Sequence, residues 1–356
     1  MADNLRILHI PAYALHGGCE KNCYHFITNS PQHSHDIWVL DKTGPMSQAW
    51  SSLGVDVRHL DILKAGMFAF KNALQSQLKG ASYDIVICWS TIRLPLQLHA
   101  LDEVTSNVKV YLGNPVGKNY NPWKDVLLKT IFSHKTKVKL MACSEYVAVS
   151  YRKSPYFSSY PVEVSLNPVE IPSSPRLEPM GKTFVMGMVA RLDPIKDHAT
   201  VIRAFKEVHD KHPDTALHLV GDGKLRKDLE QLTAQLGLTA HVRFHGDVSD
   251  VYSQLRNWNL FLYATTPDEG LGSAVAESMA NGLPCVLADL PMLRELAPEN
   301  TASWFAPFDA ASLATQVSAL MKDPVLRRRM EEQAYAHASV AFTSQRFIES
   351  YVNDVR

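Results

Sequence analysis

Long apolar runs are missing from this sequence. No stretch of ~18 consecutive apolar residues occurs, so we expect no membrane-spanning helix. The opening residues MADNLR lead directly into a strand-like run, so we also expect no signal peptide.

Cysteine is scarce: there are five, and no pair has the spacing of a zinc ribbon or a CxxC motif. We therefore expect reduced, mostly buried thiols in a cytoplasmic protein.

Net charge is absent as well. The chain has 36 Lys and Arg against 36 Asp and Glu, which argues against a dedicated nucleic-acid binder. The balance hides an asymmetry, because residues 1–180 have four more basic than acidic side chains and residues 181–356 have four fewer. Either separate partners for the two halves or unequal solvated surfaces would produce this difference.

Two motifs of well-known ligand sites are also missing. No strand leads into GxGxxG, which argues against a dinucleotide-dependent dehydrogenase. No DxD-type pair of carboxylates lies in a suitable loop, so we expect no metal site and no cofactor. Any anionic ligand would then need cationic side chains.

What is present is a rhythm of short apolar strands and helical segments. It runs through the N-terminal half, pauses at the proline- and serine-rich residues 165–182, and restarts with TFVMGMVARL. Such alternation is typical of parallel sheets covered by helices. We therefore predict an α/β protein of two doubly wound, Rossmann-like domains. A central cleft between them would hold a ligand beyond the carboxyl ends of the strands.

One loop of the second half combines features of a ligand site. In DEGLGSAVAESMANGLP, residues 268–284, Glu269 and Glu277 flank a Gly-Leu-Gly turn that begins a helix. Ser273 is the expected N-cap of this helix, and Asn281-Gly282 its end. Glycines admit a ligand close to the backbone, and a helix start favours an anion. The pattern predicts a phosphate between two carboxylates that bind hydroxyl groups, as in a nucleotide-sugar.

A second loop supplies the cations that such an anion needs. In VARLDPIKD, Arg191 and Lys196 follow another strand, with Asp197 or His198 near the next helix start. Arg offers a planar fork to phosphate oxygens, whereas Lys is a point charge. The glycines of LVGDG, Gly221 and Gly223, we interpret as turn residues rather than ligand contacts.

These segments together resemble the retaining glycosyltransferases of family 4, which have the GT-B fold. The resemblance covers nearly the whole chain and is strongest over residues 184–296, in GMVARLDPIKDHATVIRAF, LHLVGDGKLR, VRFHGDVSDV and EGLGSAVAESMANGLPCVLAD. It implies an acceptor domain at 1–170 and a nucleotide-sugar donor domain at 171–338. It also implies a C-terminal helix at 339–356 that crosses back to the first domain.

The resemblance also implies roles for individual residues. Arg191 and Lys196 would bind the donor diphosphate, and Glu269 would contact the transferred sugar. Glu277 would hold the ribose hydroxyls, and the turn near Val248 would contact the base. Backbone amides at the turn and at the N-terminal loop HGGCEK would meet sugar and phosphate, at Gly270, Leu271, Gly272, Gly17 and Gly18. His16 beside that loop is a further candidate.

One position departs from the family pattern. Relatives often have a histidine after the strand that corresponds to DIVICWS, where this chain has Trp89-Ser90-Thr91. We therefore name no general base. The family reaction is usually described as front-face displacement, in which the departing phosphate takes the acceptor proton. Neutralisation by Arg191 and Lys196 would then be the main electrostatic contribution.

The segment 117–139 has six lysines, one aspartate and interleaved apolar side chains. A basic amphipathic helix of this kind can lie on anionic lipid, and the positive N-terminal half favours such contact. The alternative is an ordinary helix with a core-facing apolar side and solvated lysines. On the first interpretation the protein is cytoplasmic and peripheral on the inner face of the plasma membrane.

The leading hypothesis is a metal-independent, retaining hexosyltransferase of bacterial cell-surface polysaccharide synthesis. Its donor would be a nucleotide-sugar, with a UDP-sugar favoured and a GDP-sugar next. It would pass a hexose or N-acetylhexosamine to a lipid-linked or oligosaccharide acceptor. Two alternatives of the same fold are a sugar-nucleotide epimerase, which needs additional acid/base side chains, and a non-catalytic binding subunit. No nucleic-acid partner is expected.

Overall fold

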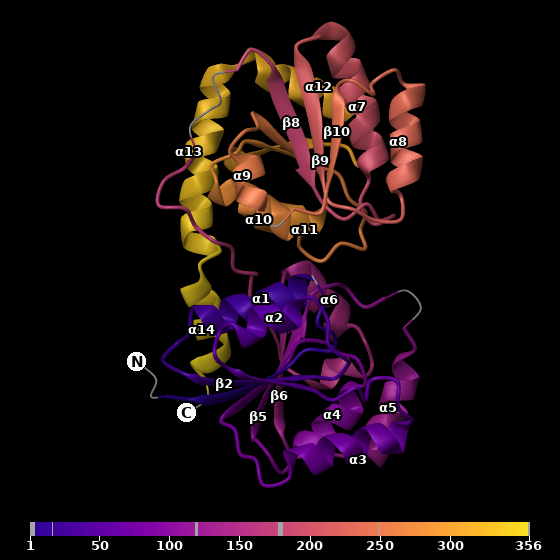
Figure 1. Ribbon diagram of the computed structural model, residues 1–356, viewed down its shortest axis with the longest axis vertical. Helices are drawn as coiled ribbons and strands as arrows, with labels where there is room; N and C mark the ends of the chain where they lie inside the picture. Colours follow the sequence, from indigo (N-terminus) through magenta and orange to yellow (C-terminus); the bar gives the residue numbers. More distant parts are fainter. Residues whose placement is uncertain (1–3, 16, 118–119, 177–180, 249, 355–356) are drawn as a thin grey trace. The chain divides into compact units, whose positions relative to one another are not determined.

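A computed structural model describes residues 4–15, 17–117, 120–176, 181–248 and 250–354. The chain forms two compact units. Unit 1 comprises Met1–Pro168 and Ser344–Arg356, and unit 2 comprises Val169–Thr343. Each unit is a twisted sheet covered by helices (Figure 1). Within the described residues, no helix is long and apolar enough to cross a membrane.

Unit 1 is built on seven parallel strands in the order β3-β2-β1-β4-β5-β6-β7. The central strands read as continuous apolar runs because both faces of a parallel sheet are covered. Every residue of Ile85–Cys88, for example, is buried. The strands are β1 (Arg6–Ile10), β2 (Ser34–Val39), β3 (Asp56–His59), β4 (Ile85–Cys88), β5 (Asn107–Leu112), β6 (Lys137–Ala142) and β7 (Val162–Val164).

The helices of unit 1 cover both faces of this sheet. Helix α1 packs against α2 and α14, whereas α3, α4 and α5 form a second layer (Figure 1). The helices are α1 (Gly18–Thr28), α2 (Met46–Ser51), α3 (Met67–Leu78), α4 (Leu94–Leu101), α5 (Pro122–Ile131), α6 (Glu145–Arg152), the 3₁₀ turn η1 (Phe157–Ser159) and α14 (Ser344–Val352).

Unit 2 repeats the plan with six parallel strands in the order β10-β9-β8-β11-β12-β13. The order reverses between β8 and β11, which is the topological switch point of a doubly wound sheet. The strands are β8 (Phe184–Val189), β9 (Thr215–Val220), β10 (Val242–Gly246), β11 (Leu260–Tyr263), β12 (Cys285–Ala288) and β13 (Ala302–Phe305).

The helices of unit 2 pack in two groups, α7 with α8 and α12, and α10 with α13 (Figure 1). Asp197, Asp309 and Asp323 cap the starts of α7, α12 and α13 through their side chains. The helices are α7 (His198–Lys211), α8 (Arg226–Gln235), α9 (Val251–Leu255), α10 (Ser273–Ala280), α11 (Pro291–Leu296), η2 (Glu299–Thr301), α12 (Ala310–Lys322) and α13 (Pro324–Ala341).

The proline- and serine-rich segment is not a free linker over its described part. The units meet in sequence at Pro168/Val169, and the residues that follow pack onto unit 2. Arg176 is buried, and its guanidinium forms an ion pair with Glu331 of α13 at 3.1 Å. Residues 177–180 lie outside the described part of the chain.

Helix α14 joins unit 1 although it lies at the far end of the chain. Its Phe347 and Tyr351 pack their rings around Phe26 of α1, with centroids 6.2 and 5.7 Å away. Tyr351 also stacks on Trp89. Three of these rings are at most 1% exposed, so the last helix is part of the core of unit 1 rather than an appendage.

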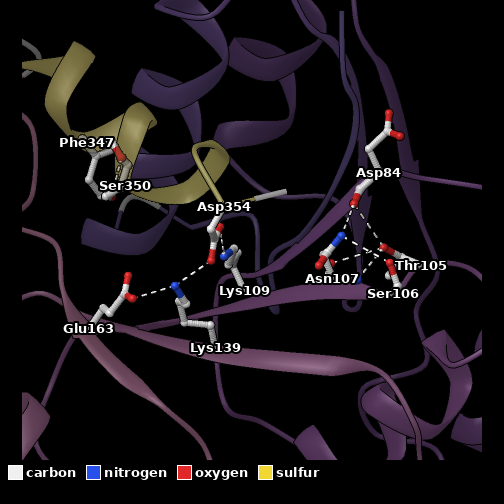
Figure 2. Close-up of polar contacts among 10 residues, drawn as sticks. All are labelled: Asp84, Thr105, Ser106, Asn107, Lys109, Lys139, Glu163, Phe347, Ser350 and Asp354. Atoms are coloured by element: carbon white, nitrogen blue, oxygen red, sulfur yellow. Dashed lines mark hydrogen bonds and ion pairs between the residues drawn. The ribbon is translucent and has the colours of Figure 1, made fainter. Parts of the chain in front are cut away.

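Past α14, Asp354 forms an electrostatic clasp with two lysines of the sheet (Figure 2). Its carboxylate oxygens lie 2.5 Å from Nζ of Lys109 and 2.6 Å from Nζ of Lys139. Lys139 also contacts Glu163 at 2.6 Å. The Lys109 side chain is only 4% exposed, so Asp354 compensates a buried charge that would otherwise be costly.

Replacing Asp354 with asparagine is expected to lower the free energy of unfolding by about 1–2 kcal/mol, because the buried Lys109 loses its charged partner. Burial alone would raise the pKa of Asp354, but the hydrogen bonds from Lys109 and Lys139 bring it below its ordinary value. The stabilisation by Asp354 is therefore present above the ordinary carboxyl pKa, and it is lost as the pH falls through the lowered pKa.

Urea unfolding of the variant at neutral and acidic pH measures this effect. Glu349→Gln is the matched control, because it removes an exposed carboxylate that contacts Gln345 within α14. An Asp354→Asn variant as stable as this control at neutral pH would contradict the clasp.

The basic segment 117–139 is not one helix, contrary to the prediction. Helix α5 spans only Pro122–Ile131, and strand β6 begins at Lys137. The alternation of lysines with Val138 and Leu140 is the period of a strand, with both apolar side chains buried. Residues 118–119 lie outside the described part of the chain.

Candidate functional site

The predicted site residues of unit 2 gather at its topological switch point. Arg191 and Lys196 follow β8, Glu269 follows β11, and these two strands are neighbours in the sheet. Loops at the carboxyl ends of such strands are where open α/β sheets bind ligands. The sequence segments that lie almost eighty residues apart are thus brought together by strand order.

Backbone hydrogen bonds hold the two loops together. The Thr266 amide donates to the Ile195 carbonyl at 2.9 Å, and the Asp197 amide donates to Ala264 at 3.1 Å. The Thr265 hydroxyl donates to the same Ile195 carbonyl at 2.9 Å. The two loops, residues 190–197 after β8 and 264–272 after β11, therefore support each other as a preorganised site requires. We call them together the platform.

Lys196 and Glu269 face each other on this platform and form an ion pair. Tyr263, the last residue of β11, touches both: Nζ of Lys196 lies 2.7 Å from its hydroxyl, and that hydroxyl lies 2.9 Å from Oε2 of Glu269. The Gly270 amide donates to the other carboxylate oxygen at 3.1 Å. Glu269 is 8% exposed and Tyr263 2%, so the cluster is largely shielded from water.

Burial controls the protonation of this cluster. It lowers the pKa of Lys196 to about 7, and the positive charge of Arg191 adds to the shift while Asp193 opposes it. The Glu269 carboxylate in contact with the ammonium favours its charged form. Burial likewise lowers the pKa of His198, at the start of α7, to about 4, so that imidazole is neutral at physiological pH.

Arg191 lies in a different environment. Its side chain is 71% exposed and forms an ion pair with Asp193 at 2.9 Å. An exposed arginine can change partner at little cost, because surface ion pairs contribute only ~0–1 kcal/mol. The platform thus offers one buried and one accessible cation.

The glycine turn leads into α10 as predicted, but its cap differs. Gly272 is the N-cap, with φ of +83°, and Ser273 is the first helical residue, so the prediction of Ser273 as cap is wrong. The left-handed backbone at this position favours glycine. Leu271 is buried beneath the turn. Asn281 and Gly282 end the helix as expected, with Gly282 at φ of +68°.

Glu277 lies one turn into α10 and is half-buried. Its charge helps to raise the pKa of Tyr263 and of Tyr252, although burial is the larger cause for both. These electrostatic effects place Glu277 near β11 and near the start of α9. It therefore belongs to the same end of the sheet as Lys196 and Glu269.

Val248 lies in the loop after β10, at the same carboxyl edge of the sheet of unit 2. The residues that follow it, Asp250 and Tyr252, line a pocket of about 470 Å³. The Tyr252 hydroxyl closes one side of this pocket by bonding to the backbone amide and carbonyl of Glu170, each at 3.1 Å. A base-binding role for Val248 stays a prediction.

The predicted N-terminal loop lies at the switch point of unit 1. Gly17 is the N-cap of α1, and Gly18 is its first residue. A Cβ atom on Gly18 would have no atom within 4 Å, whereas one on Gly17 would collide with the carboxylate of the buried Glu20, which lies against the start of this helix. Their proposed contact with the diphosphate stays a prediction. His16 lies outside the described part of the chain.

Trp89, which stands where relatives often have histidine, is a core residue. It is 1% exposed, and its Nε1–H donates to Nδ1 of His9 at 3.1 Å. Its ring also stacks on Tyr351 of α14. This position therefore serves the packing of unit 1 and presents no side chain for acceptor chemistry.

Sequence reasoning missed Tyr263 and did not predict the packing role of the glycines of LVGDG, which it interpreted as turn residues. Tyr263 ends a strand at the switch point, and that position was the available signal. Gly221 and Gly223 also permit close packing, because a Cβ atom on Gly221 would lie 2.2 Å from the Ala190 carbonyl oxygen and one on Gly223 would lie 2.6 Å from the Leu192 carbonyl oxygen. They allow the loop after β9 to support the loop that carries Arg191.

Comparisons with known proteins agree with this geometry. The family model for "Glycosyl transferases group 1" matches residues 173–337, which is most of unit 2. The chain is 34% identical over 158 residues to a phosphatidyl-myo-inositol mannosyltransferase of Mycobacterium tuberculosis, covering 42% of this chain and 40% of that protein. It is 31% identical over 179 residues to the lipopolysaccharide core biosynthesis glycosyltransferase LpsD of Rhizobium meliloti, covering 50% of each.

These matches span only about two-fifths to half of the relatives' length. The fold extends further. The crystal structure of Anabaena Alr3699/HepE in complex with UDP and glucose superimposes with a TM-score of 0.82 at 18% identity, covering 98% of this chain and 99% of that one. The chain is therefore related to the group 1 glycosyltransferases: it has their GT-B fold, and residues 173–337 are a domain of that family.

Proposed function

We propose that the protein is a retaining glycosyltransferase of family 4. It moves a hexose or N-acetylhexosamine from a nucleotide-sugar, a UDP-sugar first and a GDP-sugar next, to a lipid-linked or oligosaccharide acceptor. The observation that carries the proposal is the switch-point platform of a group 1 domain, where Lys196 and Glu269 face each other. Cytoplasmic synthesis of bacterial cell-surface polysaccharide is the proposed setting, in keeping with the lipopolysaccharide and glycolipid relatives.

The proposed roles of the individual residues are those that the resemblance to family 4 implies. Arg191 and Lys196 bind the diphosphate and neutralise the departing phosphate, while Glu269 contacts the hydroxyls of the transferred sugar. Glu277 holds the ribose, and Val248 contacts the base through its main chain. The backbone amides that approach sugar and phosphate are those of Gly270, Leu271, Gly272, Gly17 and Gly18. Cationic side chains do the work of a metal here, so no divalent metal is required.

Release of nucleoside diphosphate from UDP-glucose, UDP-N-acetylglucosamine and GDP-mannose, with and without EDTA, tests this proposal. Transfer predicts release that survives EDTA and is lost in Glu277→Gln. Isomerisation of the donor sugar without release would favour a sugar-nucleotide epimerase. Binding without either reaction, in the presence of candidate lipid and glycan acceptors, would favour a non-catalytic subunit.

We also propose that unit 1 contacts the membrane surface through α5. Trp123, Leu127 and Ile131 are spaced four residues apart, form one stripe, and are 68, 61 and 55% exposed. Phe68 of α3, 61% exposed, extends the stripe, because its ring lies 5.9 Å from that of Phe132. The exposed Lys124 lies beside the stripe. Apolar side chains flanked by lysine suit an anionic lipid surface.

A Trp123→Ser, Leu127→Ser double variant is expected to bind vesicles of phosphatidylglycerol and phosphatidylcholine at least about tenfold more weakly than wild type, because two large side chains no longer enter the bilayer interface. Co-sedimentation at low salt measures the binding. Val325→Ser, which removes a 78% exposed side chain of unit 2, is the control. Wild-type protein that does not sediment with these vesicles would refute the membrane contact.

A further inference from the structure

The Tyr263 hydroxyl lies between the two groups of opposite charge on the platform. It is 2.7 Å from Nζ of Lys196 and 2.9 Å from Oε2 of Glu269. The directions of these hydrogen bonds are fixed by chemistry, since an ammonium only donates and a carboxylate only accepts. The phenol oxygen therefore accepts from Lys196, and its proton goes to Glu269. A hydroxyl can do both at once, whereas a phenyl ring can do neither.

The surrounding structure holds the Tyr263 ring in place. It lies at the end of β11, packs parallel to the ring of Phe261, and is 2% exposed. A Cβ atom on Gly272 would lie 3.1 Å from Cε1 of Tyr263 and 3.2 Å from Leu293. The glycine at the start of α10 therefore leaves room for this ring. The turn at Gly272 and the ring of Tyr263 therefore pack directly against each other.

We propose that Tyr263 is a positioning residue that sets the spacing between the phosphate-binding ammonium of Lys196 and the sugar-binding carboxylate of Glu269. This inference rests on the proposed function. Without donor, the two groups neutralise each other. A nucleotide-sugar takes the ammonium for its diphosphate and the carboxylate for its sugar. The hydroxyl of Tyr263 then remains hydrogen-bonded to both groups and keeps both side chains in place when the donor binds.

Tyr263 also affects the charge of Lys196. The charged and titratable groups that face this ammonium are Glu269 and Tyr263 on the β11 side, and Arg191, Asp193 and His198 on its own loop and helix. The tyrosine oxygen accepts a stronger hydrogen bond from the charged ammonium than from the neutral amine, so its removal favours the neutral amine. A neutral amine binds a diphosphate weakly.

Tyr263→Phe tests the inference, with Tyr335→Phe as the matched control. Tyr335 donates its hydroxyl to the Pro172 carbonyl at 2.8 Å in the same unit and touches no proposed site residue. The probe is UDP or GDP, whichever binds wild type. We expect the Kd of Tyr263→Phe to rise about tenfold at about pH 8.5 and much less at about pH 6, where Lys196 stays charged. The kcat of sugar transfer should also fall about tenfold.

A purely structural role would change the Kd by the same factor at both pH values, and that result would overturn the inference. So would a Tyr263→Phe variant that matches Tyr335→Phe in every measurement. If wild type binds neither UDP nor GDP, the proposed function itself fails, which is a distinguishable outcome.

Glu269→Gln provides an independent test if Tyr263→Phe does not fold. It removes the anion that competes for Lys196 and keeps an acceptor for the Tyr263 hydroxyl. We expect nucleoside diphosphate to bind at least as tightly as in wild type at about pH 6, while kcat falls. Weaker binding of the nucleoside diphosphate to this variant would show that Glu269 does not compete with the diphosphate for Lys196.

Discussion

Lys196→Met is expected to reduce the rate of sugar transfer by about 10²–10³-fold, the usual effect of losing one preorganised donor to a developing negative charge. Methionine keeps most of the length of the side chain and removes the ammonium. Glu269 retains hydrogen bonds from the Tyr263 hydroxyl and the Gly270 amide. The protein should therefore stay folded, so the loss reflects the missing charge.

Initial rates of nucleoside diphosphate release, with melting temperatures as a check of folding, measure this effect. Lys206→Met is the control, because Lys206 forms a surface ion pair with Asp210 within α7 of the same unit. The control should retain wild-type rates. A Lys196→Met enzyme within about threefold of wild type would show that another group neutralises the leaving phosphate.

Gly221→Ala is expected to destabilise unit 2 by about 2–5 kcal/mol, because it combines backbone strain with a steric collision. Gly221 has φ of +126°, and a Cβ atom there would lie 2.2 Å from the Ala190 carbonyl oxygen and 3.4 Å from the Arg191 amide. Relief of the collision would displace the loop that carries Arg191. Binding of nucleoside diphosphate should therefore weaken together with stability.

Thermal unfolding is the measurement, since about 2–4 °C of melting temperature corresponds to 1 kcal/mol in a domain of this size. Gly237→Ala separates the two causes: its φ is +72°, but no atom lies within 4 Å of a Cβ there. It should cost only the backbone strain, about 1 kcal/mol. An equal loss of stability in the two variants would show that the close approach to Ala190 does not contribute to the destabilisation.

Much of the fold follows from patterns in the sequence. Most strands of both units are largely apolar runs of four to six residues bounded by loops, and most of the alternation predicted from them is present. The Asn281-Gly282 end of α10 was also predictable, because it depends on local interactions. The start of α7 was predicted near Asp197 or His198, and Asp197 is its cap. The Ser273 cap failed because a left-handed Gly272 already ends the turn.

The candidate site was predictable where one loop carries its own signal. Arg191, Lys196 and Glu269 stood out because charged residues follow apolar strands. Tyr263 was not found, because only the neighbouring positions of β8 and β11 place its hydroxyl between Lys196 and Glu269. The basic segment was misread for a similar reason: residues 137–139 join the sheet by pairing with β5, and a long-range contact outweighs local helical pattern.

Binding of nucleoside diphosphates tests the central claim most directly. Thermal shifts of wild type, Arg191→Ala and Glu277→Ala should be measured against UDP, GDP, ADP, dTDP and NAD. A ligand at 100 times its Kd stabilises the folded state by about 2.7 kcal/mol, which is easily seen. The account predicts a clear shift with one nucleoside diphosphate, UDP first and GDP next, that either substitution abolishes. A shift with none of them, or one that survives both substitutions, would contradict a donor site on this platform.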